Sequence, residues 1–236
     1  MIRQSIVAGI ALLLLAATGL AQAHPPPLDA TIAEVQSDAR VIVTSFHADA
    51  SAALGHALAV APEVAIANTP GLATYDSRSN EIVLAHWATL DGAARGFFLS
   101  LADTEEAAGR LFVGLFDWFL IAHEMTHWLQ RAIGLQLDRY GSEAMANDVA
   151  VAFFARSPEG EESLVALAGL VETARARLDD PTPDGVDPAV YFNATYGPLT
   201  QDPARYGYYQ FGFILDAIAR RAEFSFVEIV SSLRPQ

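Results

Sequence analysis

The chain has 236 residues, of which 28 are acidic and 14 are basic, giving a net charge of −14 at neutral pH. This balance argues against a nucleic-acid partner, because counterion release requires a basic face on the protein. All basic residues are arginine, and cysteine is absent. Disulfide scaffolds, thiolate metal sites and Schiff-base lysines are therefore excluded, so any chemistry must use the remaining polar side chains.

The first 23 residues have the pattern of a secretory signal peptide. One arginine precedes an apolar run from Ile6 to Ala17, and Ala21-Gln22-Ala23 forms a small-x-small cleavage pattern. The alternative is an uncleaved membrane anchor, but the run is shorter than the roughly 20 apolar residues that a span requires. We expect residues 1–23 to be the signal peptide and residues 24–236 to be one secreted or periplasmic domain, with no stable membrane insertion after cleavage.

The front half of this domain predicts both strands and a helix. The β-branched stretch from Arg40 to Phe46 predicts a strand, the alanine-rich stretch from Ala50 to Val60 a helix, and residues 64–68 a short strand. Residues 73–76 and 81–85 flank a polar turn and predict a hairpin. A small mixed or antiparallel sheet is the expected result.

From Asp103 onward the pattern becomes helical, and no strand is predicted after that point. The expected helices are 104–115, 117–132, 142–156, 161–178, 207–221 and 224–233. Residues 179–205 are rich in proline and aspartate and are expected to be irregular. Within this stretch, the segment from Asp179 to Asp187 offers oxygen donors for calcium but lacks the terminal glutamate of an EF-hand, so a solvated acidic loop is the favoured interpretation. The fold class is therefore α+β, with the sheet packed on a mainly helical C-terminal half.

The strongest motif is His123-Glu124-Met125-Thr126-His127, an H-E-x-x-H sequence within an apolar helical segment. On a helix, positions i and i+4 share one face, so both imidazoles can bind one zinc ion while Glu124 projects toward the water to be activated. The alternative is a pair of surface histidines, which the uncharged flanking residues disfavour.

A catalytic zinc ion usually has three protein ligands, and no histidine follows His127. Glu143 is the best remaining candidate, because a short turn between helices would return the start of the next helix to the metal. The alternative is an acidic residue that only favours the N-terminus of its helix.

These residues resemble the gluzincin metallopeptidases, the peptidase-MA-like family related to thermolysin and the alanyl aminopeptidases. HEMTHWLQ is similar to the family's H-E-x-T-H-x-x-Q form, and SEAMAN to its S-E-G-x-A-E segment, although Asn147 replaces an acid. Tyr209-Gln210-Phe211-Gly212 is similar to the family's Y-x-x-G. The resemblance implies a zincin-like fold, a Zn²⁺ ion held by His123, His127 and Glu143, and hydrolysis of a peptide or protein substrate.

In that mechanism Glu124 is the general base, and Tyr209 stabilises the oxyanion. Tyr206 and Tyr208 compete with Tyr209 for this role, and either Asn147 or Asp148 could orient a histidine ligand. Two other functions stay open: a non-catalytic zincin-like binding or scaffold protein, and a zinc hydrolase of non-peptide cell-wall amides.

Overall fold

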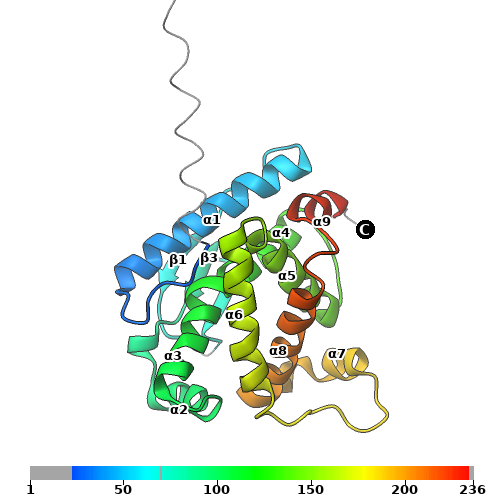
Figure 1. Ribbon diagram of the computed structural model, residues 1–236. Coiled ribbons are helices and arrows are strands. Elements are labelled where there is room, and N and C mark those ends of the chain that lie inside the picture. The colour runs from blue at the N-terminus through cyan, green and yellow to red at the C-terminus, as the bar shows by residue number, and fades with distance from the viewer. Residues whose placement is uncertain (1–22, 70, 234–236) are drawn as a thin grey trace, which may run out of the picture.

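The computed structural model describes residues 23–69 and 71–233, so all but the last residue of the expected signal peptide lies outside the described residues. The described chain is mainly helical, and its small sheet packs against α1 and α4 (Figure 1). The helices are α1 (Ile32–Leu54), α2 (Gly92–Ser100), α3 (Glu105–Gly114), α4 (Leu120–Ala132), α5 (Arg139–Phe154), α6 (Pro158–Arg175), α7 (Pro188–Leu199), α8 (Pro203–Ala219) and α9 (Phe226–Ser232). The strands are β1 (Glu63–Ile66), β2 (Ala73–Asp76) and β3 (Glu81–Leu84).

The sheet has the strand order β1-β3-β2 and lies in the N-terminal half, as expected for an α+β chain. β1 is parallel to β3, with Val64 beside Ile82, and β2 is antiparallel to β3, with Tyr75 beside Ile82. The predicted strand at 64–68 and the predicted hairpin are confirmed. Both β1 and β2 are edges of this mixed sheet, and β2 is the edge that contacts α4.

The strand predicted from Arg40 to Phe46 is wrong, because this segment lies inside α1. Its apolar residues fall at helical spacing and bury one face of the helix, which is formed by Val35, Ala39, Ile42, Val43, Phe46 and Ala50. A capping box between Thr31 and Glu34 starts the helix, and Gly55 ends it at a φ of 74°. The predicted helix at 50–60 therefore extends only to Leu54. Burial of the periodic face outweighs the strand propensity of β-branched residues.

The predicted helices of the C-terminal half are confirmed, and the described residues after Asp103 contain no strand. Residues 179–205 are not irregular throughout, because they contain α7, which begins with Asp187 as its cap and Pro188 in its first turn. Proline is tolerated there because the first N–H groups of a helix have no intrahelical partner. Helix α2, capped by Asp91, was not predicted either.

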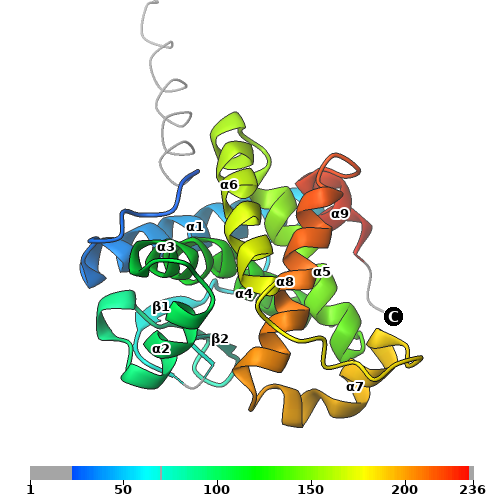
Figure 2. The ribbon, with the colours of Figure 1, turned by 60° about the horizontal axis from the view of Figure 1, so that its bottom comes forward.

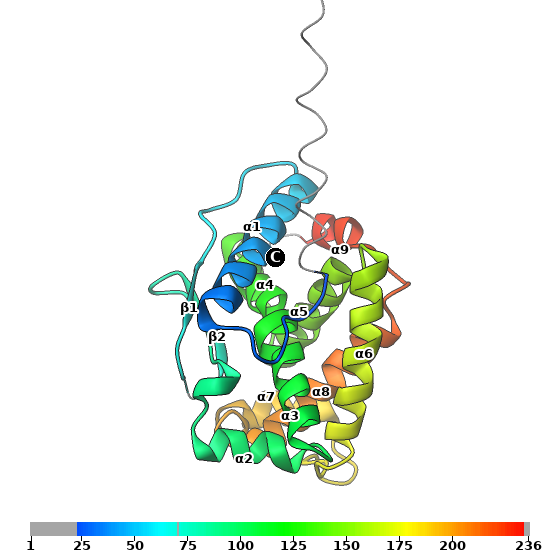
Figure 3. The same cartoon turned by 60° about the vertical axis from the view of Figure 1, so that its left-hand side comes forward.

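Helices α3 and α4 are joined without a break by a π-helical turn, Leu115–Phe119. α4 lies in the interior of the molecule, where it contacts α1, α5, β2 and β3 (Figure 3). α6 and α8 lie side by side, and both contact α5 (Figures 1 and 2). Because α4 is packed on several sides, side chains along it are held at defined positions between the sheet and α5. No described helix meets the length and apolarity needed to span a bilayer.

Candidate metal centre

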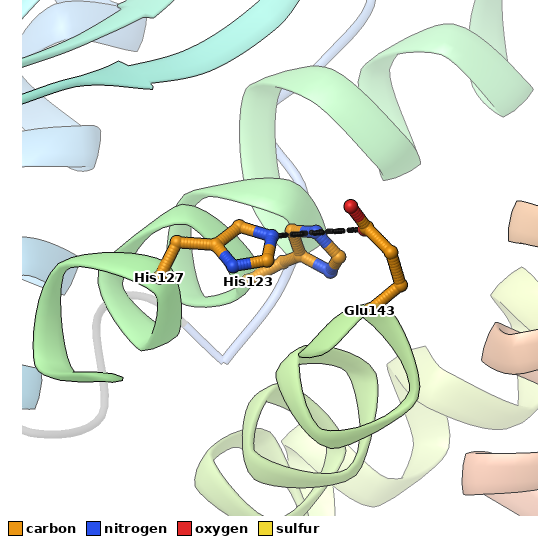
Figure 4. Close-up of side chains that lie close together, drawn as sticks. All are labelled: His123, His127 and Glu143. Atoms are coloured by element: carbon orange, nitrogen blue, oxygen red, sulfur yellow. Dashed lines mark hydrogen bonds and ion pairs between the residues drawn. The ribbon is translucent and has the colours of Figure 1, made fainter. Parts of the chain in front are cut away.

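Three side chains predicted as ligands converge between α4 and α5 (Figure 4). His123 and His127 lie one turn apart on α4, and Glu143 faces them from α5. The Oε2 atom of Glu143 is 3.3 Å from His123 Nε2 and 3.6 Å from His127 Nε2, and the two imidazole nitrogens are 3.1 Å apart. One donor atom from each residue lies within 4.8 Å of the others. This group could hold a metal ion.

The turn between α4 and α5 brings Glu143 to the two histidines. Gly134 adopts a left-handed conformation with a φ of 68°, and Asp138 caps α5 by accepting from the Gly141 N–H. Gln130 and Ser142 then join the two helices: the Ser142 hydroxyl donates to Gln130 Oε1 at 2.9 Å, and Gln130 Nε2 donates to the Ser142 carbonyl at 3.2 Å. The metal-binding group therefore depends on a connection that is held at both ends.

Polar side chains around the metal-binding group form hydrogen bonds with two of the predicted ligands, His127 and Glu143. Gln130 Oε1 lies 3.1 Å from His127 Nδ1, which leaves His127 Nε2 to point at the carboxylate. Gln210 Nε2 donates to Glu143 Oε2 at 2.8 Å, and the Tyr196 hydroxyl donates to Glu143 Oε1 at 3.2 Å. Such outer hydrogen bonds fix the rotamer of a ligand before the metal arrives.

The protonation states follow from the same contacts. Burial alone would raise the pKa of Glu143, but hydrogen bonds from His123 and His127 hold it well below its usual value. Burial alone would lower the pKa of His127, but the hydrogen bond and charge of Glu143 raise it to about 9. In the metal-free protein at neutral pH, a His127 imidazolium therefore faces a Glu143 carboxylate. A divalent cation would replace that proton as the positive partner.

Glu124 lies next to His123 in sequence but faces another partner. Its Oε2 accepts a hydrogen bond from the backbone N–H of Tyr75 at 2.7 Å. Tyr75 is on the edge strand β2, so the sheet holds the carboxylate of Glu124 beside the metal-binding group rather than within it. Glu124 lines the same cleft as the three ligands and is 8 % exposed. A carboxylate in this position can exchange protons with a molecule bound in the cleft.

Three buried polar atoms near the ligands have no hydrogen-bond partner among the described residues: His123 Nδ1, Asn147 Oδ1 and Gln210 Oε1. Asn147 lies one turn after Glu143 on α5, and its amide nitrogen donates to the Glu143 carbonyl at 2.9 Å. Asp148 instead accepts from Arg220 at 2.7 Å. Of the two candidates for orienting a histidine, Asn147 is therefore the one that remains buried beside the ligands.

The structure does not bring Tyr209 to the metal-binding group. Its hydroxyl bonds to Thr182, and its ring packs against Phe192 and Phe213 in a separate aromatic cluster. Tyr208 lies under the Arg175 guanidinium, 4.3 Å from ring centroid to Cζ. The position of Tyr209 therefore does not support its predicted role in stabilising the oxyanion.

Tyr206 is the tyrosine of this group that lines the cleft. Its hydroxyl accepts a hydrogen bond from Gln210 Nε2 at 2.8 Å, because residues four apart share one face of α8. Burial and the charge of Glu143 raise the pKa of Tyr206 well above its usual value, so the phenol keeps its proton. The Y-x-x-G match had instead predicted Tyr209, three residues later on α8.

Tyr196 and Gln210 are functional candidates that the sequence did not single out. Tyr196 belongs to α7, within the segment expected to be irregular, and therefore carried no positional signal. Gln210 lies inside the Y-x-x-G match, at a position that the motif leaves free. The sequence feature that could have pointed to Gln210 is its spacing of four residues from Tyr206, which places both on one face of the helix.

The ligands, Glu124 and Tyr206 line one open cleft with a volume of about 1520 Å³. Its lining residues come mainly from β2, α2, α4, α5, α7 and α8. This volume exceeds the usual range for small-molecule sites, about 300–1,000 Å³. The cleft is therefore large enough for an extended peptide chain.

Comparisons with protein-family profiles, with curated proteins and with solved structures found no match to this chain. The resemblance to gluzincins accordingly rests on the three sequence motifs alone.

Proposed function

We propose that this chain is an exported zinc metallopeptidase of the gluzincin type that hydrolyses peptide bonds. The observation that carries the proposal is the grouping of His123, His127 and Glu143 beside Glu124 in one open cleft. Two imidazoles and one carboxylate are the donor set of many catalytic zinc sites, and three protein ligands leave a position for water or substrate.

The donor chemistry fits zinc better than other common metals. Calcium and magnesium prefer sites built mainly from oxygen, whereas this site has two nitrogen donors and one carboxylate. Neutral histidines and one carboxylate leave a net positive charge on a bound divalent ion. That charge would make a water in the open position more acidic and polarise a substrate carbonyl.

The residues of the chain have separate roles in this proposal. Glu124, held by the Tyr75 N–H, accepts a proton from water and passes it to the leaving amine. Tyr206, whose phenol stays protonated, donates a hydrogen bond to the oxyanion in place of Tyr209. Tyr196 and Gln210 hold the carboxylate of Glu143 so that both of its oxygens are oriented before substrate binds.

The test combines metal content with hydrolysis of a peptide library by the purified protein. We expect about one zinc ion per chain in wild type, much less in Glu143→Ala, and retained zinc with loss of hydrolysis in Glu124→Gln. Glu172→Gln is the matched control, because Glu172 is an exposed glutamate on α6.

Wild type that binds no zinc, even after reconstitution, would overturn the proposal and favour a binding or scaffold role. Equal hydrolysis by wild type and Glu124→Gln would also overturn it. Bound zinc with no peptide hydrolysis would instead favour a non-peptide amide substrate.

A further inference from the structure

Two arginines lie on the same side of the metal-binding group. Arg131 follows His127 by four residues on α4, and Arg139 precedes Glu143 by four residues on α5. α4 and α5 are joined by the turn between these arginines, so each is displaced by one helical turn from its ligand toward that connection. Both arginines line the cleft. The α4–α5 end of the cleft is therefore its cationic end.

These two arginines differ from most others in this acidic chain. Seven described arginines form ion pairs with carboxylates: Arg95, Arg110, Arg156, Arg177, Arg205, Arg220 and Arg221. Within the described residues, neither Arg131 nor Arg139 forms such a pair. The Arg139 guanidinium lies over the Tyr196 ring, 5.0 Å from its centroid, which fixes its direction without neutralising its charge.

Arg131 and Tyr75 of β2 both line the cleft, and both also line a second, smaller pocket. Burial raises the pKa of Tyr75, and the Arg131 charge opposes that rise. Among the described residues that line the cleft, Asp138 is the acidic residue at this end, and its carboxylate accepts a hydrogen bond from the Gly141 N–H as the cap of α5. The side chains at this end therefore sum to a net positive charge, with guanidinium groups on both helices.

The opposite end of the cleft is apolar. Leu120 lies three residues before His123 on α4, and Phe116 lies in the π-helical turn before it. Phe97 of α2 lines the same end, and all three side chains are half-buried. The cleft thus changes from apolar to cationic along α4, with the metal-binding group between the two ends.

We propose that the α4–α5 end of the cleft binds a carboxylate of the substrate through Arg131 and Arg139, so that the substrate is an anionic peptide with an apolar residue on the other side of the scissile bond. This inference rests on the proposed peptidase function. Arg131 lies about 6–12 Å along α4 from the two histidines, at about 1.5 Å per residue. An extended peptide covers about 3.3 Å per residue, which places the carboxylate two to four residues from the scissile bond.

The experiment uses internally quenched peptides that differ only in this region. One pair has Glu or Gln two to four residues from the cleaved bond, and a second pair ends there in a free carboxylate or an amide. These arms distinguish an acidic side chain from a chain terminus. We expect wild type to hydrolyse at least one anionic peptide with a kcat/KM about tenfold or more above its neutral match, as charge-assisted hydrogen bonds allow, with the ratio falling as salt is added.

The variants are Arg131→Gln, Arg139→Gln and Arg131→Glu, with Arg40→Gln as a control at an exposed arginine of α1. We expect the first two to lower the anionic-to-neutral ratio, Arg131→Glu to favour a peptide with Lys at that position, and Arg40→Gln to keep the wild-type ratio. Equal rates for anionic and neutral peptides in wild type, or an unchanged ratio in both glutamine variants, would overturn the proposal.

Binding of the same peptides to Glu124→Gln, measured by fluorescence anisotropy, separates this proposal from the peptidase function. Tighter binding of the anionic peptide that depends on Arg131, without hydrolysis by wild type, would support the carboxylate site and contradict the peptidase. Hydrolysis with no anionic preference in either assay would contradict the carboxylate site alone.

Discussion

Metal binding to this chain should depend steeply on pH, because His127 must lose a proton to become a ligand. Glu143 raises the pKa of His127 to about 9 in the metal-free protein. At pH 7 the proton therefore competes by a factor of about 100, which corresponds to roughly 2.7 kcal/mol of metal-binding free energy. The apparent zinc affinity should rise about tenfold per pH unit from pH 7 and level off above about pH 9.

The folding stability of the metal-free protein should also depend on pH. A histidine whose pKa is raised by folding stabilises the folded state below its unfolded pKa, and this contribution is lost as the pH rises through about 9. The metal-free protein should therefore lose stability between about pH 6.5 and 9, whereas the zinc-loaded protein should not show this loss.

The assay is chelator competition for zinc between pH 6.5 and 9, together with calorimetry in two buffers of different ionisation enthalpy. About one proton should leave His127 per zinc ion bound at pH 7. NMR titration of the metal-free imidazole gives the pKa directly, and in Glu143→Gln this pKa should fall, because burial is then opposed only by the charge of Glu124 and the hydrogen bond with Gln130. A zinc affinity that is flat between pH 7 and 9, or a His127 pKa near 6.5 in metal-free wild type, would refute the reasoning.

Three further predictions concern single side chains. Tyr196→Phe removes one hydrogen bond to the carboxylate ligand and should weaken zinc binding about 10–100-fold in the same competition assay; an unchanged affinity would contradict the positioning role. Burial raises the pKa of Asp117 to about 8, so its contribution to stability is full below pH 4 and is lost as the pH rises through 8. Asp117→Asn should therefore stabilise the chain to urea by at most about 5 kcal/mol at pH 8 and little at pH 4.5, and an equal effect at both would count against this. Gly160→Ala places a Cβ 2.1 Å from a backbone carbonyl and should lower the thermal midpoint, whereas Gly169→Ala in the same helix meets nothing within 4 Å and should raise it slightly. Similar shifts of the thermal midpoint in the two variants would contradict this prediction, because they would show that the backbone moves to relieve the clash.

The sequence by itself determined the features that depend on short-range spacing. His123 and His127 share a face because they are four residues apart on one helix, and that helix was predictable from its apolar flanks. The hairpin of β2 and β3 followed from alternation around a polar turn. The place of Glu143 could be inferred because a short connection allows only a few ways to return the chain.

Tertiary structure alone decided the features that depend on which face of an element is buried. Residues Arg40 to Phe46 have the composition of a strand, but they pack as a helix because their apolar face contacts α4 and α9. Tyr206 and Tyr209 are three residues apart on α8, and both pack against the aromatic cluster that includes Phe192 of α7. Only the tertiary packing decides that Tyr206 also lines the cleft whereas Tyr209 is buried within the cluster.

The same reason applies to the contact between Glu124 and Tyr75, which are 49 residues apart. A motif gives the type of a residue and its place on a helix. The side chains and backbone groups that the residue contacts come from other segments, whose positions are set by the packing of the whole core. Local periodicity therefore determined the ligands, and long-range packing decided what surrounds them.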